Sequence, residues 1–374
     1  MRGCWRGVSC LLLLVWLSAC ADTRYYAQSV GGHLKLMAAA RPVENWLAAP
    51  QTPEPLRQRL GLAQSLRHFS VTELHLPDNA SYRRFADLQR RYVVWNVVAA
   101  PVLSLELKEW CFPVAGCVGY RGYFDEADAQ ALASELRGQG LEATVYGVPA
   151  YSTLGWMNWL GGDPLLNTFV NLPDGELARL MFHELAHQVL YVAGDTTFNE
   201  SFATAVEHLG GDAWLANQAT PQARQVFAVY DQRRQQFRAL TRCTRERLTQ
   251  IYKENSPLAQ DSKGLIAMKN EVFQDFRARY RILKQSWGGY AGYDAWVAEA
   301  NNASFGAQAA YDDLEPAFEA LFVREGRDWP RFFAAVKQLA SRPQAERLAQ
   351  LQALGADASA TTRQAHTPTQ LNPL

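Results

Sequence analysis

The sequence predicts a mostly helical α+β fold, in which a small mixed β-sheet precedes a pair of helices and a helical C-terminal half. Three observations indicate this class. Short β-branched or alternating segments occur before residue 150, and an apolar stripe with helical spacing begins near residue 177. Residues 217–285 then form a long polar stretch with a helical pattern. This order favours a sheet on one side of a cleft and helices on the other.

The first half of the chain contains the predicted strands. A helix is expected from Tyr25 to about Trp46, and Pro53-Glu54-Pro55 separates it from a second helix over residues 56–69. The predicted strands cover residues 71–76, 92–98, 120–124 and 142–146. A third helix, over residues 126–139, is closed by Gly140.

The second half is predicted to be helical. A helix starts at residues 173–176 and carries its apolar stripe to Val192. Residues 287–293 interrupt the polar helical stretch, and three more helices are expected up to about Leu354. The remaining residues are rich in Ala, Thr, Gln and Pro, which predicts disorder.

Five regions follow from this organisation. They are a signal segment (1–19), an N-terminal helical segment (20–70), an α/β subdomain (71–215), a helical C-terminal subdomain (216–354) and a disordered tail (355–374).

Composition is that of an ordinary globular protein. The 374 residues are 48% hydrophobic and 11% aromatic, which excludes an intrinsically disordered chain. Basic and acidic residues balance at 37 each, and no basic cluster with interleaved aromatic residues occurs. We therefore expect no nucleic-acid partner.

The N-terminus has the features of an export signal. Arg2 and Arg6 precede a short apolar segment, too short to span a membrane. Leu17-Ser18-Ala19-Cys20 then resembles the lipobox of bacterial lipoprotein signals, in which Cys20 becomes the lipidated first residue. An ordinary secretory signal cut nearby is the alternative. A lipid on Cys20 would anchor the protein to a membrane of the cell envelope, facing the periplasm. Ala21 favours the outer over the inner membrane by resemblance to enteric sorting rules.

Two cysteines of the mature chain are candidates for a disulfide. Cys111 and Cys117 flank a turn-like segment that contains Pro113 and Gly116. In an oxidising compartment a bridge between them is expected. Two separately buried thiols are the alternative.

The segment His183-Glu184-Leu185-Ala186-His187 is the strongest chemical signal in the chain. Residues four apart lie on one face of a helix, so His183 and His187 can bind one metal ion together. Glu184 lies beside the metal rather than on it, where a general base for the attacking water belongs. Histidine is rare here, 7 of 374 residues, so chance occurrence is disfavoured against the alternative of an inert polar surface.

A catalytic zinc site requires a third protein ligand, and two glutamates compete for the role. Glu200 lies in Asn199-Glu200-Ser201-Phe202-Ala203, which resembles the ligand helix of aminopeptidase-N-type gluzincins. Its spacing from His187 is shorter than in that group, and spacing alone favours Glu207, as in thermolysin-like enzymes. We assign Glu200, because the length of a loop changes more easily than the face of a helix that meets the metal.

Several sequence blocks together resemble a family of predicted bacterial zinc aminopeptidases that are often envelope lipoproteins. They are residues 115–124, 150–156, 182–187, 199–203 and 301–303. The resemblance implies a gluzincin-like zinc helix pair after the sheet, one Zn²⁺ and a peptide substrate. The segments 151–156 and 161–164 are then either simple connections or an edge along which a peptide adds as a strand.

The resemblance leaves the reaction open at two points. The chain lacks the Gly-x-Met-Glu-Asn segment with which aminopeptidase-N-type enzymes hold a free amine. An envelope endopeptidase, or a lipid-anchored assembly factor with a vestigial zinc site, therefore competes with the aminopeptidase. For the donor to the oxyanion we predict Tyr311, with Tyr290 and Tyr293 as alternatives.

Overall fold

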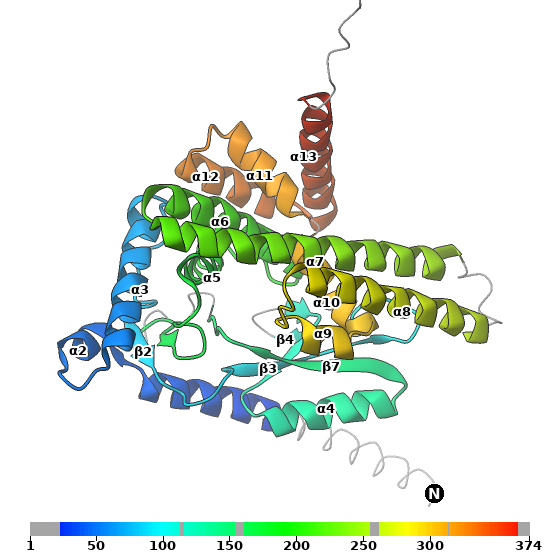
Figure 1. The fold of residues 1–374 in the computed structure, drawn as a ribbon, viewed down its shortest axis with the longest axis horizontal. Coiled ribbons are helices and arrows are strands. Elements are labelled where there is room, and N and C mark those ends of the chain that lie inside the picture. Colours follow the sequence, from blue (N-terminus) through cyan, green and yellow to red (C-terminus); the bar gives the residue numbers. More distant parts are fainter. Residues whose placement is uncertain (1–22, 113–115, 154–160, 255–261, 313, 366–374) are drawn as a thin grey trace, which may run out of the picture.

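The computed structural model describes residues 23–112, 116–153, 161–254, 262–312 and 314–365. Within these residues the fold is α+β and mostly helical, as the sequence predicts (Figure 1). The signal segment 1–19 and Cys20 lie outside the described residues. For residues 309–312 and 357–365, the structure describes the backbone but not the side chains.

The N-terminal segment is helical but differs from the prediction in two places. The first helix covers residues 23–39, and the predicted continuation to Trp46 is wrong. Arg41–Pro42 instead form strand β1, which pairs with β2 (Arg84–Ala86), before the short helix α2 (Val43–Ala48). Pro42 has an extended backbone, so the chain leaves the helical path there.

The predicted strand over residues 71–76 is also wrong. Helix α3 (Glu54–Thr72) occupies its first two residues, and a loop follows. His75 has a φ of 52°, which an extended strand cannot accommodate. The alternation in the sequence reflects burial, because Leu74 and Leu76 both reach the core from this loop.

Among the described residues, two three-stranded sheets and a two-stranded hairpin precede the central helices. In the order β6-β3-β7, strand β3 (Val94–Pro101) lies antiparallel between β6 (Arg121–Tyr123) and β7 (Leu141–Val148). In the order β1-β2-β8, strand β8 (Leu165–Leu166) runs parallel to β2.

Successive residues of β3 pack against different helices. Val97 and Ala99 contact helix α4 (Glu126–Gly138), whereas Val98 and Ala100 contact helix α10 (Asn302–Asp312). The sheet is therefore covered on both faces, as period-two alternation requires.

The rest of the described chain is helical. The elements are α5 (Asp174–Ala186), α6 (Thr196–Asn217), α7 (Pro221–Glu254), α8 (Ser262–Ser286), α9 (Asp294–Glu299), α10, α11 (Glu315–Arg324), α12 (Trp329–Ala340) and α13 (Gln344–Ala365). Five helices thus follow residue 293, where three were predicted. Helix α13 continues to Ala365, so the predicted disorder is wrong for residues 355–365, where an alanine-rich composition favours helix; residues 366–374 lie outside the described residues.

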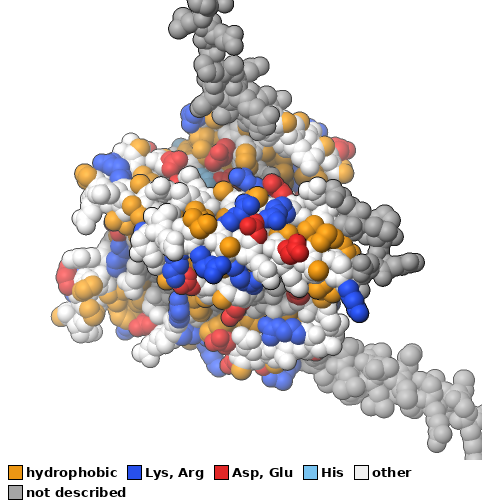
Figure 2. All heavy atoms as spheres, turned by 45° about the vertical axis from the view of Figure 1, so that its right-hand side comes forward, with side chains coloured by type: hydrophobic (Ala, Val, Ile, Leu, Met, Phe, Trp, Pro, Cys, Tyr) orange, Lys and Arg blue, Asp and Glu red, His pale blue; other side chains and the backbone are white. Residues whose placement is uncertain are grey.

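The surface agrees with the balanced composition. The face shown in Figure 2 mixes cationic, anionic and apolar side chains. Among the described helices, none is both long enough and apolar enough to cross a bilayer.

An aromatic cluster holds α6 against the C-terminal helices. Phe202 is fully buried, and its ring lies 5.8 Å from that of Phe318, 6.0 Å from Phe332 and 6.2 Å from Phe333. Helices α6, α11 and α12 therefore share one core with α5.

Replacing Phe202 by alanine should lower the free energy of unfolding by about 3–5 kcal/mol, because it removes a buried ring and leaves a cavity. Urea denaturation followed by circular dichroism measures the change. Val323→Ala, at a 53% exposed position of α11, is the control and should change stability by less than about 0.5 kcal/mol. Equal stability of the two variants would show that α6 does not depend on this cluster.

Candidate metal centre

Two helices and the loop between them build the site. Helix α5 ends at Ala186, so Val189 and Val192, which the apolar spacing assigned to it, lie in the loop and pack on the core. Asp195 caps α6 by accepting a hydrogen bond from the Phe198 N–H. This cap also forms an ion pair with the buried Arg347 of α13.

Asn199 holds the loop onto α6. Its side chain accepts a hydrogen bond from the Val192 N–H and donates one to the Val192 carbonyl, both at 2.8 Å. Asn199 is buried and immediately precedes Glu200. Sequence reasoning recognised it only as part of a motif; the structure shows that it fixes the helix start that carries Glu200.

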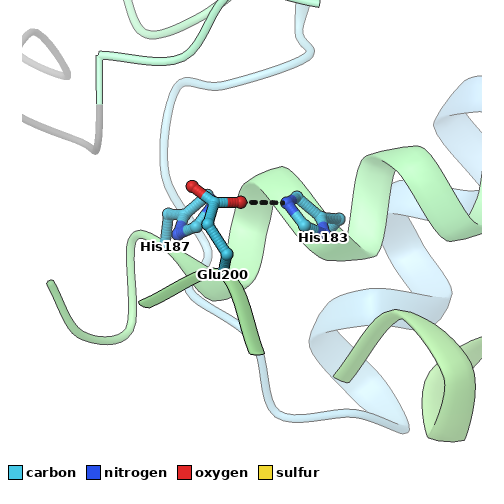
Figure 3. A group of neighbouring side chains, drawn as sticks. All are labelled: His183, His187 and Glu200. Atoms are coloured by element: carbon cyan, nitrogen blue, oxygen red, sulfur yellow. Dashed lines mark ion pairs between the residues drawn. The ribbon is translucent and has the colours of Figure 1, made fainter. Parts of the chain in front are cut away.

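The structure brings His183, His187 and Glu200 together (Figure 3). Oε2 of Glu200 lies 3.3 Å from Nε2 of His183 and 3.7 Å from Nε2 of His187. One ligand atom from each residue lies within 4.8 Å of the others. This group could hold a metal ion.

Glu207 lies on the other side of His183. Its Oε2 is 3.0 Å from Nδ1 of His183, the ring nitrogen that faces away from Glu200. Its Oε1 accepts a hydrogen bond from Nε of Arg179 at 2.9 Å. Arg179 is 3% exposed and also pairs with Asp231 of α7. Glu207 therefore orients a histidine instead of joining the ligand group.

The electrostatics of the two glutamates differ in a decisive way. Burial acts to raise the pKa of both, but Arg179 lowers that of Glu207, whereas His187 and His183 lower that of Glu200. Within the described chain, Glu200 pairs with no arginine or lysine. A buried carboxylate that faces only imidazoles is suited to a bound cation.

The two histidines have opposite protonation tendencies. Burial acts to lower the pKa of His183, but hydrogen bonds to Glu200 and Glu207 raise it well above its ordinary value. Burial lowers the pKa of His187 to about 4, so this imidazole is neutral and available as a ligand. Binding of a metal ion would release the proton that His183 otherwise carries.

Glu184 contacts the segment 151–156, for which the sequence left two interpretations open. Burial raises the pKa of Glu184 to about 7, while a hydrogen bond with Ser152 acts in the opposite direction. The buried Asp163 holds that segment by accepting hydrogen bonds from the N–H and hydroxyl of Thr153, at 3.0 and 2.7 Å. Residues 154–160 of the segment lie outside the described residues.

The two alternatives to Tyr311 pack elsewhere in the described structure. Tyr290 and Tyr293 belong to an aromatic cluster beside α7, in which Tyr293 stacks on Phe237 at 4.0 Å. The carboxylate that acts on their pKa values is Glu176, rather than Glu184 or Glu200. The side chain of Tyr311 lies outside the described side chains, so its role stays a prediction.

Three other tyrosines lie within the electrostatic reach of Glu200. Burial raises the pKa values of Tyr120, Tyr146 and Tyr191, and the negative charge of Glu200 adds to each shift. Tyr120 follows strand β5 (Gly116–Val118), and Tyr146 lies on β7. No local sequence pattern links these strands to α6, so sequence reasoning did not find them.

A cavity of about 600 Å³ is linked to this group through two of these tyrosines, although His183, His187 and Glu200 do not themselves line it. Tyr120 and Tyr146 line it, together with Thr196 and Thr197 from the first turn of α6. Glu200 follows these threonines by three to four residues and so projects from the same side of the helix. The cavity is thus next to the side of α6 that carries Glu200.

A disulfide stabilises one wall of this cavity. Cys111 and Cys117 are bonded to each other as cross-strand partners in a hairpin of β4 (Trp110–Phe112) and β5. Gly116 packs so closely on the loop before α6 that a Cβ would lie 2.4 Å from the Gly194 nitrogen. The bridged hairpin therefore abuts the connection between the two ligand helices.

A second group of side chains has ligand-like spacing but a different character. His208, Glu315 and Glu319 also offer atoms within 4.8 Å of one another. Here Nη1 of Arg238 lies 3.4 Å from Glu315, so a fixed cation already balances part of the charge. We interpret this group as an ion-pair cluster that joins α6 to α11.

Comparison with known proteins identifies the family. A family model described as "Putative aminopeptidase" matches residues 24–351. Because the match covers most of the chain, the protein belongs to this family. No curated protein and no solved structure matches the chain.

Glu200→Ala should abolish metal binding, because it removes one of three ligands and leaves two imidazoles. Glu207→Ala should retain a metal ion with affinity about 10–100-fold weaker, since only the orientation of His183 suffers. Titration against a chromophoric chelator measures both affinities. Glu207→Gln, which keeps a hydrogen-bonding side chain, is the control for the Arg179 contact. Metal loss in Glu207→Ala with retention in Glu200→Ala would reverse the assignment.

Proposed function

We propose that this family member is a zinc-dependent aminopeptidase of the bacterial cell envelope. One zinc ion would be held by His183, His187 and Glu200. The observation that carries the proposal is the convergence of two imidazoles and a buried carboxylate next to the carboxyl group of Glu184, with no lysine or arginine of the described residues paired to that carboxylate.

The donor set fits zinc better than other common ions. Two imidazole nitrogens and one carboxylate oxygen are the His₂Glu set of catalytic zinc sites, which keep one position for water or substrate. Magnesium and calcium prefer ligand sets made of oxygen atoms. Glu207 behind His183 supplies the outer carboxylate that such histidines commonly have.

The chemistry divides between the ion and the protein. When bound, zinc supplies Lewis acidity, which polarises a peptide carbonyl and acidifies water. The Glu184 carboxylate accepts a proton from the attacking water and returns it to the departing amine. A phenol hydroxyl would donate a hydrogen bond to the developing oxyanion. In addition to Tyr311, the candidates for this donor are Tyr120, Tyr146 and Tyr191.

The cavity supports an exopeptidase over an endopeptidase. Its charged lining residues in the described chain are Glu106, Glu109 and Asp195, of which Asp195 is already paired with Arg347. An acidic lining is complementary to the free α-ammonium group of a peptide. These carboxylates would bind the free amine of the substrate, which is the role of the Gly-x-Met-Glu-Asn segment that the sequence lacks.

Envelope location is part of the proposal. Cys20 would carry the lipid, with the protein facing the periplasm, more readily at the outer than at the inner membrane. The Cys111–Cys117 bridge supports an oxidising compartment.

Glu184→Gln tests the reaction. The variant should keep its fold and its zinc, while hydrolysis of amino-acid p-nitroanilides falls by about 10²–10⁴-fold, because the proton acceptor is lost. Glu176→Gln, on the same helix but paired with Arg234, is a control for altered charge on α5. Near-normal turnover of Glu184→Gln would refute the general-base role.

The choice of substrate separates the candidate functions. The wild-type protein should cleave free-amine substrates and leave an N-blocked, internally quenched peptide intact. The opposite preference would identify an endopeptidase. Failure on both substrates, with zinc bound, would indicate an assembly factor with a vestigial site.

Cys20→Ser tests the anchor. The variant should move from the membrane fraction to the soluble fraction, because the lipid supplies the stable attachment. Fractionation followed by immunoblotting measures the shift. A variant that still sediments with membranes after washing with salt would require another stable attachment.

A further inference from the structure

The helix of residues 23–39 packs on the domain with one face. The Tyr25 ring contacts that of Tyr123 at 5.5 Å, and Gln28 accepts a hydrogen bond from the Phe124 N–H. Further along the helix, His33 and Leu36 are buried. These contacts fix how the helix is rotated about its axis, and therefore which side chains face outwards.

The outward face of this helix is apolar. Tyr26, Val30 and Leu34 recur every four residues and are 43%, 58% and 57% exposed. Ala27 and Ala38 are exposed on the same side. Three of the ten large hydrophobic side chains that the described structure exposes thus form one stripe on one short helix. A contiguous exposed apolar stripe marks an interaction surface.

Cations border the stripe along one edge. Arg24 and Lys35 are eleven residues apart, about three helical turns, so they project from the same side of the helix. Arg24 also reaches Asp128 of α4 at 2.8 Å. An apolar face with basic residues at its edge is the pattern of helices that lie in a membrane interface.

The position of the helix in the chain selects the occupant of this face. Only two residues, Ala21 and Asp22, separate Cys20 from residue 23, where the described helix starts. The three Cα–Cα steps from residue 20 to residue 23 span at most about 11 Å. Lipid on Cys20 would therefore keep the first turn within reach of the headgroup region, where the stripe can insert.

We propose that the helix of residues 23–39 lies along a lipid bilayer, with Tyr26, Val30 and Leu34 inserted at the boundary between headgroups and acyl chains. This inference rests on the lipid anchor of the proposed function. The lipid would supply the stable attachment, and an amphipathic helix beside it is a suitable second contact with the membrane. In Figure 1 the helix lies along the lower edge and α11–α13 at the opposite edge, so these helices would point away from the membrane.

Fluorescent labelling of the full, lipidated protein tests this orientation. Cys243, the free exposed cysteine of the described chain, is first changed to serine, while Cys111 and Cys117 remain bonded. Val30→Cys is then labelled with an environment-sensitive fluorophore. Val323→Cys on α11, with similar exposure of 53%, is the matched control. The proteins are reconstituted on vesicles of phosphatidylethanolamine and phosphatidylglycerol and recovered by flotation.

On vesicles, the label at position 30 should shift to shorter wavelength, and its quenching by iodide should fall several-fold compared with the same protein carrying Cys20→Ser in solution. The label at position 323 should remain unchanged. A protein that floats while the label at position 30 stays as accessible as that at 323 overturns the orientation and leaves the anchor intact. A protein that does not float overturns both. Hydrolysis of the p-nitroanilide is measured in parallel, so failure of the peptidase proposal is seen separately.

Discussion

A buried negative charge without a fixed positive partner is the constraint on which the site depends. Glu200 faces two imidazoles, and within the described residues neither lysine nor arginine pairs with it. Glu207 lies on the opposite side of His183 and forms an ion pair with Arg179. A carboxylate in the first situation is stabilised when a cation enters, whereas one in the second is already neutralised and can only orient its neighbour. On this difference rests the proposal that Glu200 is a metal ligand and that Glu207, on the same helix, is a supporting residue.

The rest of the helical framework keeps these side chains in place. Arg179 links Glu207 on α6 to Asp231 on α7, and Arg234 continues the chain of ion pairs to Glu176 on α5. At the other end of the site, Asn199 and the Asp195–Arg347 pair fix the start of α6. Such buried networks are costly to leave incomplete, so they favour one arrangement of the two helices. An ion that binds three ligands benefits from this, because little rearrangement is needed.

The sheet contributes the remaining surroundings of the site, although it carries none of its ligands. Strands β5 and β7 bring Tyr120 and Tyr146 to the cavity beside α6, and the bridged hairpin abuts the loop before that helix. The N-terminal helix packs on the end of β6 and leaves its apolar stripe outside. Through β7 and β6, a peptide-cleaving centre and a membrane-facing helix would thus share the β6-β3-β7 sheet as common support.

The sequence by itself determined what depends on short-range geometry. The spacing of His183 and His187 on a helix follows from 3.6 residues per turn, and so does the position of Glu184 beside them. Short-range patterns also predicted three strands and one helix, at residues 92–98, 120–124, 142–146 and 126–139. The sequence could not separate buried alternation from a strand at 71–76, where a positive φ at His75 decides. Only the tertiary structure brought Tyr120 and Tyr146 near Glu200 and placed Tyr290 and Tyr293 in a different cluster. Contacts between distant segments depend on how the sheet and the helices pack, and no local sequence pattern encodes that packing.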